Sequence, residues 1–429
     1  MSVSRILYSL LLYLIFPLVV FRLFWRGRSN PGYRHRIAER LGYISFFNKN
    51  KPIIWVHAVS VGETIAVKPL VESLLDHYSN HQILLTTTTP TGSDMVKKLF
   101  SDRVEHVYFP YDLPGVIARF VNRVNPKIVV IVETEIWPNL YAKLNKEEIP
   151  LVLINARLSE KSTQKYLKFN NLIAETILNV NTLCVRSDID AKRFRLLGAT
   201  EKQLVVSGNI KFDIDIIQQQ VVQGKQWRKQ WQSMNSRNLS VWVAASTHAG
   251  EDEKILTIYQ GLLKHLPTLK LVLIPRHPER FDDVYQLCKG LKEEGINTLR
   301  HSQVENHTSK QSHIILGDSM GEMQSWFATA DVVFMGGSLV ETGGHNPIEA
   351  IALGVPVVSG PYMFNFDDVN HSLTEAGLLS ICDASEALEE KILSLLQKKN
   401  SGFKENAKNF MQQHQGVTAS LVKQLSKLI

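Results

Sequence analysis

Short runs of apolar residues alternate with stretches that can form helices over most of the chain after residue 51. Continuous apolar runs of this kind are typical of strands that are buried on both faces of a sheet. When such strands alternate with helices, the chain forms strand–helix–strand units with right-handed crossovers and a parallel sheet. The sequence therefore predicts an α/β fold, with strands in the following runs: 52–60, 82–89, 104–111, 126–134, 150–158, 182–187, 203–209, 241–247, 269–276, 312–318, 331–338 and 356–360.

A polar stretch, QQQVVQGKQWRKQWQSMNSRN at 218–238, interrupts this alternation near the middle of the chain. The 429 residues are too many for one ordinary core and fit two domains of about 200 residues each. We expect residues 26–217 and 239–429 to form two doubly wound, Rossmann-like domains that face a cleft, with 218–238 as a linker. The last helix of the chain can cross back to the first domain. Ligands of such sheets bind beyond the carboxyl ends of the strands.

The N-terminus carries an uncharged apolar run, ILYSLLLYLIFPLVVF at 6–21, which is followed by a series of arginines up to residue 40. A spanning helix needs about 20 apolar residues, so this run is at the short end. Positive flanks remain cytoplasmic, and no small-residue cleavage pattern follows the run. We therefore expect residues 1–25 to anchor a cytoplasmic body to a membrane, either across the bilayer or in its interface. The alternative is a buried core helix.

The remaining composition narrows the chemistry. Cys184, Cys288 and Cys382 are scattered without a CxxC pair, so we expect reduced, buried thiols. Neither GxxxxGK[ST] nor GxGxxG is present, which argues against an ATPase or a dehydrogenase. Asp318 and Asp331 stand alone without a DxD pair, so no metal site is expected. The net charge of +7 has a local source in the N-terminal arginines, and we expect no nucleic-acid partner.

Polar clusters stand at the carboxyl ends of two predicted strands in the second half. In PRHPER at 275–280, Arg276 offers a forked donor for phosphate and His277 adds another donor. In GDSMGEM at 317–323, two glycines let the backbone turn tightly beside a ligand. The amides at the start of the next helix suit a phosphate or a base edge. The alternatives are a surface turn for the first cluster and a plain strand-to-helix loop for the second.

The stretch GGSLVETGGHNPIEA, at 336–350, is the most informative one in the second half. Two Gly-Gly pairs flank a short loop, and Asn346-Pro347 is a good start for a helix. The backbone amides of Gly343 to Asn346 can hold a phosphate, and Glu349 can accept both hydroxyls of a ribose. The sequence thus predicts a nucleotide site, with a glycine-rich structural turn as the alternative.

In the first half, the stretch IWVHAVSVGET at 54–64 begins as a buried strand and ends in Gly62-Glu63-Thr64. Gly62 allows a sharp turn, and Glu63 should then lie in the first turn of a helix that starts near Thr64. A carboxylate at this place is either a favourable first-turn acid, stabilised by the helix dipole, or a functional group at the carboxyl edge of the sheet.

These motifs together resemble a known family. The chain is similar to the 3-deoxy-D-manno-octulosonic acid (Kdo) transferases of lipopolysaccharide synthesis, glycosyltransferase family 30, over almost its whole length. The resemblance rests on the N-terminal anchor with its arginines and on the following motifs: HAVSVGE, TTTTPTG (86–92), YFPYD (108–112), ETEIWPN (133–139), NARLS (155–159), GNIKFD (208–213), STH (246–248), PRHPERF (275–281) and GGHNPIEA (343–350).

The resemblance implies a fold and a reaction. The fold is GT-B, and the reaction is an inverting transfer of Kdo from CMP-Kdo to the lipid A precursor lipid IVA, a tetra-acylated glucosamine disaccharide bisphosphate, at the cytoplasmic face of the inner membrane. Transfer releases CMP and needs no cofactor. We expect it to be independent of metal ions, because a cationic cleft can stabilise the departing phosphate.

The resemblance also assigns catalytic roles in the first half. Glu63 is the general base that takes the proton of the acceptor hydroxyl. The helix dipole lowers the pKa of such a carboxyl, whereas a partly dry cleft or acidic neighbours raise it. Lys211 stabilises developing negative charge, and Glu133 orients Lys211 or supports the positive sugar. Without the resemblance, Lys211 reads as a surface lysine and Glu133 as a helix-start acid.

The substrate-binding residues complete the expectation. Arg34, Arg36 and Arg40 would bind the phosphates of the acceptor. The residues expected to bind CMP, the last five with less weight, are Arg276, His277, Met320, Gly321, Glu322, Asn346, Pro347, Ile348, Glu349, Ser246, Thr247, Gly343, Gly344 and His345.

Three other functions compete with this one. The first is another GT-B enzyme of the membrane that uses a UDP-sugar, such as a lipid-disaccharide synthase. The second is a UDP-sugar 2-epimerase, an isomerase with the same two-domain architecture, which the N-terminal anchor disfavours. The third is a non-catalytic nucleotide-binding membrane protein, against which the placement of Glu63 and Lys211 speaks.

Overall fold

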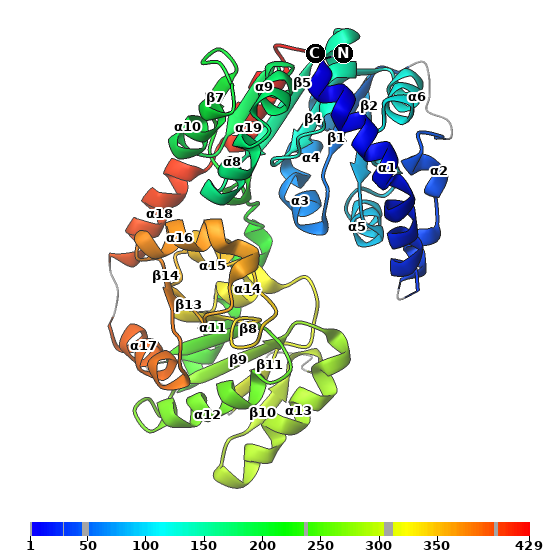
Figure 1. Cartoon of the computed structure of the whole chain (residues 1–429). Coiled ribbons are helices and arrows are strands. Elements are labelled where there is room, and N and C mark those ends of the chain that lie inside the picture. Colours follow the sequence, from blue (N-terminus) through cyan, green and yellow to red (C-terminus); the bar gives the residue numbers. More distant parts are fainter. Residues whose placement is uncertain (1, 29, 45–50, 236–238, 304–311, 399–401) are drawn as a thin grey trace. The chain divides into compact units, whose positions relative to one another are not determined.

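The computed structural model describes residues 2–28, 30–44, 51–235, 239–303, 312–398 and 402–429. The chain divides into two compact units (Figure 1): unit 1 is Met1–Asp213 with His414–Ile429, and unit 2 is Ile214–Gln413. Each unit contains a seven-stranded sheet in which all described pairings are parallel. The predicted pair of Rossmann-like α/β domains is therefore confirmed.

The sheet of unit 1 has the strand order β3-β2-β1-β4-β5-β6-β7, so β1 and β4 lie next to each other at its centre. His57 at the end of β1 lies opposite Ile131 near the end of β4. The loops that follow these two central strands therefore leave the sheet side by side. Each strand falls within one of the apolar runs that predicted it: β1 (Ile53–His57), β2 (Gln82–Thr87), β3 (Glu105–Tyr108), β4 (Pro126–Val132), β5 (Leu151–Ala156), β6 (Thr182–Val185) and β7 (Leu204–Val206).

Helices cover both faces of this sheet (Figure 1). One face packs against α6 (Pro114–Val124), α7 (Pro138–Lys146), α9 (Asn170–Leu178) and α10 (Asp188–Leu196), and the other against α4 (Lys68–His77), α5 (Pro90–Phe100) and α19 (Val417–Leu425). Helix α4 begins at Lys68, with Pro69 in its first turn. The shorter helices are α2 (Ile37–Arg40), α3 (Val61–Ala66), α8 (Glu160–Leu167) and the 3₁₀ turn η3 (Ile210–Phe212).

The N-terminal helix α1 (Val3–Arg26) is long and apolar enough to cross a membrane by length and composition. It also makes polar contacts with the body of unit 1. The Tyr8 hydroxyl donates to Asp112 Oδ2 at 3.0 Å, and Ser9 Oγ donates to Asn139 Oδ1 at 3.1 Å. Much of its apolar surface remains exposed, at Val3, Ile6, Leu7, Leu10, Leu11, Leu14, Leu18, Phe21 and Trp25.

The sheet of unit 2 has the order β10-β11-β9-β8-β12-β13-β14. Two short outer strands were not predicted, β10 (Thr298–Arg300) and β14 (Leu379–Ile381), because neither is a continuous apolar run. The predicted strands are all present: β8 (Val241–Thr247), β9 (Lys270–Pro275), β11 (Ile314–Leu316), β12 (Val332–Met335) and β13 (Val357–Ser359).

Three helices pack against one face of the unit 2 sheet: α12 (Asp252–Leu263), α13 (Phe281–Gly290) and α17 (Ser385–Gln397). Cys288 and Cys382 belong to this core and Cys184 to the core of unit 1, and all three are buried free thiols, as predicted. The remaining helices are α11 (Gln218–Asn235), α14 (Met323–Phe327), α15 (Ile348–Ala352), α16 (Asp367–Glu375) and α18 (Phe403–His414).

The segment expected to be a linker, 218–238, is a structured part of unit 2. Residues 218–235 form α11, and 236–238 lie outside the described residues. Val221, Trp227 and Trp231 are buried, and Arg228 pairs with Asp331 at 2.8 Å. Because the outer face of α11 is polar, its overall composition does not indicate that its other face is apolar and buried.

The end of the chain returns to the first unit. Helix α19, drawn in red, lies among the elements of unit 1 (Figure 1). Its buried residues Val417, Leu421 and Leu425 join the same core cluster as α4 and α5. The Asp213 carboxylate accepts the backbone N–H groups of Gly416 and Thr418, which fixes the start of α19.

Candidate active site

A cavity of about 340 Å³ opens at the carboxyl edge of the sheet in unit 1. Its walls come from the segments that follow β1, β4 and β5, which are neighbours in the sheet. Carboxyl and hydroxyl groups dominate the lining, which consists of Glu63, Glu133, Thr134, Glu135, Arg157, Leu158, Ser159, Ser162 and Tyr166. The structure thus brings together Glu63 and Glu133, which the sequence placed at two separate strand ends.

Glu63 is the third residue of α3, which begins at Val61, somewhat earlier than expected. Its carboxylate accepts the Val59 N–H at 2.7 Å and the Ser60 hydroxyl at 3.0 Å. Burial raises the pKa of Glu63 to about 7, and the charges of Glu133 and Glu135 add to this effect, while the two hydrogen bonds oppose it. The carboxyl group is therefore close to half-ionised at neutral pH, which suits a general base.

Glu133 follows β4 directly and has a left-handed backbone, with φ of 63°. A non-glycine residue in this conformation is strained by about 1–3 kcal/mol and is found most often at functional sites. Its carboxylate is paired with Arg186 at 2.9 Å and with Arg157 at 3.3 Å. Neither arginine was predicted from the sequence, although Arg157 lies within the motif NARLS.

Glu135 was also missed, although it is the second glutamate of ETEIWPN. It is half-buried and lines the same cavity. Burial raises its pKa to about 7, the Trp137 side chain opposes this effect as a hydrogen-bonding neighbour, and the charge of Glu133 adds to it. An alternation of glutamates at the end of a central strand was the signal that could have identified it.

Lys211 lies apart from this lining, on the 3₁₀ turn η3 after β7. The Asn209 side chain accepts its backbone N–H at 3.1 Å, and Asn155 accepts the N–H of Ile210 at 3.2 Å. Lys211 is partly buried. The expected orientation of Lys211 by Glu133 stays a prediction. The structure pairs Glu133 with Arg157 and Arg186.

The three arginines expected to bind acceptor phosphates differ in exposure. Arg40 is only 4% exposed, donates to the Thr88 carbonyl and stacks on Tyr108. Arg36 is partly buried and pairs with Glu39 at 2.7 Å. Arg34 is exposed, and its guanidinium donates to the Phe24 carbonyl at the end of α1. Of the three, Arg34 therefore offers the most accessible charge.

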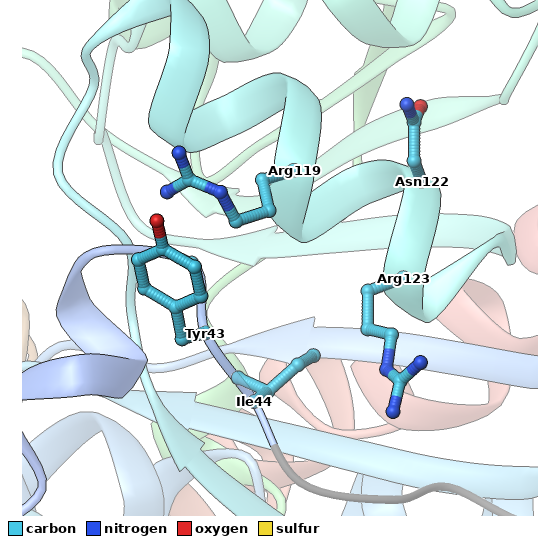
Figure 2. Close-up of a pocket in the computed structure, with 6 residues that line it drawn as sticks. Tyr43, Ile44, Arg119, Asn122 and Arg123 are labelled. Carbon is cyan, nitrogen blue, oxygen red and sulfur yellow. The ribbon is translucent and has the colours of Figure 1, made fainter.

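A larger hollow of about 520 Å³ lies elsewhere in unit 1, lined by Gly42, Tyr43, Ile44, Arg119, Asn122 and Arg123. Figure 2 shows Arg119 turned toward Tyr43 and Arg123 pointing away from it. Arg119 stacks on the Tyr43 ring at 4.0 Å and donates to the Leu41 carbonyl. The two guanidinium groups thus do not converge on one point, and the hollow is not a built anion site.

In unit 2, a buried glutamate organises the glycine-rich loop after β12. Glu251 is fully buried, and its carboxylate accepts the N–H groups of Gly337, Ser338 and Leu339 at 2.7–2.9 Å. It also accepts the N–H of His248 at 2.8 Å. Glu251 therefore ties the loop after β8 to the loop after β12, and these amides are not free to bind a phosphate.

Three histidines lie close together near the loops that Glu251 connects, and each of them follows a different strand. The Nε2 atoms of His248 and His345 are 2.9 Å apart, so one ring must donate and the other accept. The His277 ring stands edge-on to His248, with centroids 5.3 Å apart. Burial, with the charge of Arg276, lowers the pKa of His345 to about 4. At the carboxyl edge of this sheet the structure thus joins His277 and His345, which were predicted, with His248.

The other expected donor residues lie in the loops around α14 and α15. Gly343 and Gly344 have left-handed φ angles of 95° and 71° and are buried, so these positions require glycine. Asn346 does not cap α15 directly, because the helix begins at Ile348, but its side chain accepts the Ile348 N–H at 3.0 Å. Pro347 and Ile348 are buried.

Glu349 and the residues before α14 form a second group. Glu349 is partly buried and accepts a hydrogen bond from Gln324 at 3.2 Å, and burial raises its pKa. Met320 is 59% exposed, and Gly321 has a left-handed φ of 88°. Glu322 lies 3.3 Å from His301.

Ser246 and Thr247, at the end of β8, are both buried. Ser246 has a left-handed φ of 58°, and the Thr247 hydroxyl donates to Asp252 at 2.6 Å. Asp318 and Asp331 pair with arginines. Within the described part of the chain, no group of three or more His, Cys, Asp or Glu residues is arranged to hold a metal ion.

Comparison with known proteins gives this geometry a family. The model of the 3-deoxy-D-manno-octulosonic-acid transferase (kdotransferase) family matches residues 35–214, and the model of glycosyl transferases group 1 matches residues 225–412. Among solved structures, the UDP-GlcNAc 2-epimerase of Neisseria meningitidis aligns with a TM-score of 0.55 over 88% of this chain and 100% of its own. At 14% identity this likeness shows the fold alone.

Curated relatives match nearly the whole chain. The 3-deoxy-D-manno-octulosonic acid transferase of Bordetella pertussis is 33% identical over 375 residues, which cover 85% of each chain. That of Haemophilus influenzae is 40% identical over 399 residues, which cover 92% of each chain. The chain therefore belongs to the 3-deoxy-D-manno-octulosonic acid transferase family and is a glycosyltransferase.

Proposed function

We propose that this protein transfers Kdo from CMP-Kdo to lipid IVA and releases CMP, with inversion at the anomeric carbon. The observation that carries the proposal is Glu63, a carboxyl group with a pKa of about 7 that lines a cavity at the carboxyl edge of the sheet. Such a group is ionised often enough to accept a proton at neutral pH and basic enough to hold it.

The reaction follows from this placement. The Glu63 carboxylate takes the proton of an acceptor hydroxyl while its oxygen attacks the anomeric carbon of Kdo. The bond from that carbon to the phosphate of CMP breaks, and its electron pair leaves with CMP. Because Glu63 receives one proton and CMP departs as an anion, the groups of unit 2 need only to stabilise negative charge.

Unit 2 offers cations and donors for the leaving group. Arg276 and His277 follow β9 and are exposed, so both can contact a phosphate. The amides of Gly337 to Leu339 are already bound to Glu251. We therefore place the CMP phosphate against Arg276 and His277, and the ribose hydroxyls against Glu349.

The test is a transfer assay with CMP-Kdo and lipid IVA, followed by release of CMP and by mass spectrometry of the lipid. A mass increase of one or more Kdo residues, unaffected by EDTA because Arg276 and its neighbours supply the positive charge, supports the proposal. An unmodified lipid, or activity lost with EDTA and restored by magnesium, contradicts it. Release of UDP from UDP-GlcNAc would instead indicate one of the competing enzymes.

The acceptor phosphates should contact Arg34, whose guanidinium is exposed just after the apolar helix α1. The Arg34→Ala substitution is expected to raise the acceptor KM about threefold to tenfold, because one charge-assisted contact is lost. The KM for CMP-Kdo should not change. Initial rates at varied concentrations of each substrate measure both constants, and an unchanged acceptor KM would remove Arg34 from the site.

We further propose that α1 lies in the interfacial layer of the inner membrane, on the cytoplasmic side, while it stays packed on unit 1. Tyr8 and Ser9 satisfy polar groups of the body, including the buried Asp112, whose pKa is raised to about 7 by burial. A spanning α1 would leave those groups without these partners, at a cost of about 1–3 kcal/mol each. The exposed leucines of α1 then face the lipid.

A topology experiment separates the two arrangements. A cysteine placed at Val3, which is 73% exposed, should react with a membrane-impermeant maleimide added from the side of the catalytic body. The native cysteines are buried and serve as the unreactive background. Reaction only from the opposite side would mean that α1 spans the bilayer.

A further inference from the structure

The cavity beside Glu63 contains a wall that the reaction described above does not use. Glu135, Ser162 and Tyr166 line it together with Thr134, Leu158 and Ser159. Its volume of about 340 Å³ is at the lower end of small-molecule pockets, which hold about 300–1,000 Å³. A pocket of this size suits a sugar ring and not an acylated lipid.

The charge of the pocket selects against anions. Three carboxyl groups, Glu63, Glu133 and Glu135, line it with a single guanidinium, that of Arg157. Arg157 is already paired with Glu133 at 3.3 Å. A phosphate, or the carboxylate of Kdo, would be repelled here, so the ligand that fits is an uncharged group with several hydroxyls.

The Glu135 carboxyl group has the Trp137 side chain as a hydrogen-bonding neighbour but no cationic partner in the part of the chain that the structure describes. Glu133 has two arginines, whereas no ion pair to Glu135 exists among the residues that the structure describes. The backbone of Glu135 is fixed, because its carbonyl accepts the Tyr141 hydroxyl. A half-buried carboxyl group without a cation is costly unless it forms hydrogen bonds, and ligand hydroxyls in the pocket can supply them.

Part of the lining comes from one face of α8. Ser162 and Tyr166 are four residues apart and therefore lie on the same face of the helix. The start of α8 is fixed, since Ser159 accepts the Ser162 N–H at 3.1 Å and donates to its hydroxyl at 2.9 Å. Tyr166 is partly buried, so its ring offers an apolar surface and its hydroxyl a polar end.

We propose that Glu135, Ser162 and Tyr166 form the subsite for the acceptor's sugar ring, next to the hydroxyl that Glu63 deprotonates. The carboxyl group of Glu135 accepts hydrogen bonds from ring hydroxyls. The Tyr166 ring packs against the apolar face of the sugar, and its hydroxyl forms a hydrogen bond with a neighbouring sugar hydroxyl. This inference rests on the proposed function, because it takes the glucosamine ring as the acceptor group. It assigns recognition of the sugar to this pocket and recognition of the phosphates to residues outside it.

The test uses Glu135→Gln and Tyr166→Phe in the full-length protein, with Glu160→Gln as the matched control. Glu160 lies on α8, as Tyr166 does, but it is exposed and does not line the pocket. Both pocket variants are expected to raise the acceptor KM by roughly tenfold, because each loses a hydrogen bond to the sugar. The KM for CMP-Kdo should change less than twofold, and the control should match wild type. An unchanged acceptor KM in both pocket variants overturns the subsite.

A binding experiment tests the subsite without relying on the transfer reaction. A glucosamine disaccharide without acyl chains is titrated against wild type, Glu135→Gln and Glu160→Gln, with thermal unfolding as the check on folding. Binding that is weakened only in Glu135→Gln supports the subsite, even if wild type transfers no Kdo and the proposed function fails. Equal binding by all three proteins, or no binding by any, overturns the subsite while leaving the transfer reaction in place.

Discussion

The Glu63→Gln substitution is expected to lower the rate of Kdo transfer by about 10²- to 10⁴-fold at pH 8, which is the usual contribution of a general base. Glutamine keeps the size of the side chain, and its oxygen can still accept the Val59 N–H that now binds the carboxylate at 2.7 Å. The loss is therefore chemical and not structural. Single-turnover rates with CMP-Kdo and lipid IVA measure it, with Glu105→Gln, an exposed glutamate of β3, as the control.

The dependence of wild-type kcat/KM on pH should also report the ionisation of Glu63. With a pKa of about 7 for Glu63, kcat/KM is expected to fall about tenfold per pH unit below 7, as the base becomes protonated. The Glu63→Gln variant cannot be protonated at this position and should lose the part of this limb that Glu63 contributes, although Glu135, whose pKa is also about 7, still titrates in this range. A residual activity in the variant that keeps the same limb would assign the base to another residue.

At pH 8 the Glu63→Gln substitution should increase the free energy of unfolding, although it lowers the transfer rate. The pKa of Glu63 is about 7 in the folded protein against an ordinary value of 4.5, so the folded state binds this proton more tightly than the unfolded state. The resulting stabilisation is present at pH below about 4.5 and is lost as the pH rises through 7. At pH 8 the Glu63→Gln variant should therefore unfold at a higher denaturant concentration than wild type. A less stable variant would show that the carboxylate is needed for the fold.

The Glu251→Ala substitution is expected to cause the largest loss of stability, roughly 3–5 kcal/mol in the unfolding free energy of unit 2. Four backbone N–H groups donate to this buried carboxylate, and alanine leaves all four without it. Glu251→Gln should cost less, because its oxygen can accept two of the four while its amide group meets the other two N–H groups.

Protection of the loop amides from hydrogen exchange is the most direct measurement for this second prediction. The amides of Gly337, Ser338 and Leu339 should all lose protection in Glu251→Ala, whereas in Glu251→Gln only those that face the new amide group should lose it. Affinity for CMP should fall most in Glu251→Ala, because the loop that carries His345 is then no longer fixed. Glu253→Gln is the matched control, since Glu253 is exposed on the same helix. If the loop amides stay as protected in Glu251→Ala as in the control, other groups hold the loop.

Apolar runs predicted the strands well because a strand buried on both faces leaves a local pattern. The strands β10 and β14 were missed, since a three-residue strand at or near the edge of a sheet needs no continuous apolar run. Helix α11 was taken for a linker because its composition is polar, yet its buried residues recur every three or four positions, at Val221, Gly224, Trp227 and Trp231. Periodicity would have been the better guide there.

At the candidate site, the sequence located Glu63 and Glu133 through their motifs but not the groups that set their chemistry. The arginines that pair with Glu133 follow two other strands, and their meeting depends on the order of β4, β5 and β6 in the sheet. Arg40 looked like a surface charge in a basic stretch, and only packing shows it to be 4% exposed. Glu251 stands three residues after STH, but its four amide partners come from two loops.

The return of α19 to unit 1 has a consequence for how this protein is made. Domains usually fold in order as they leave the ribosome, but here the core that contains Leu70 and Leu74 also contains Leu421 and Leu425, which are translated after the whole of unit 2. The core of unit 1 is therefore complete only after residues 417–425 have been translated. Until then its apolar surface beside α4 is uncovered, so nascent chains that stall before residue 417 should depend on chaperones to stay soluble.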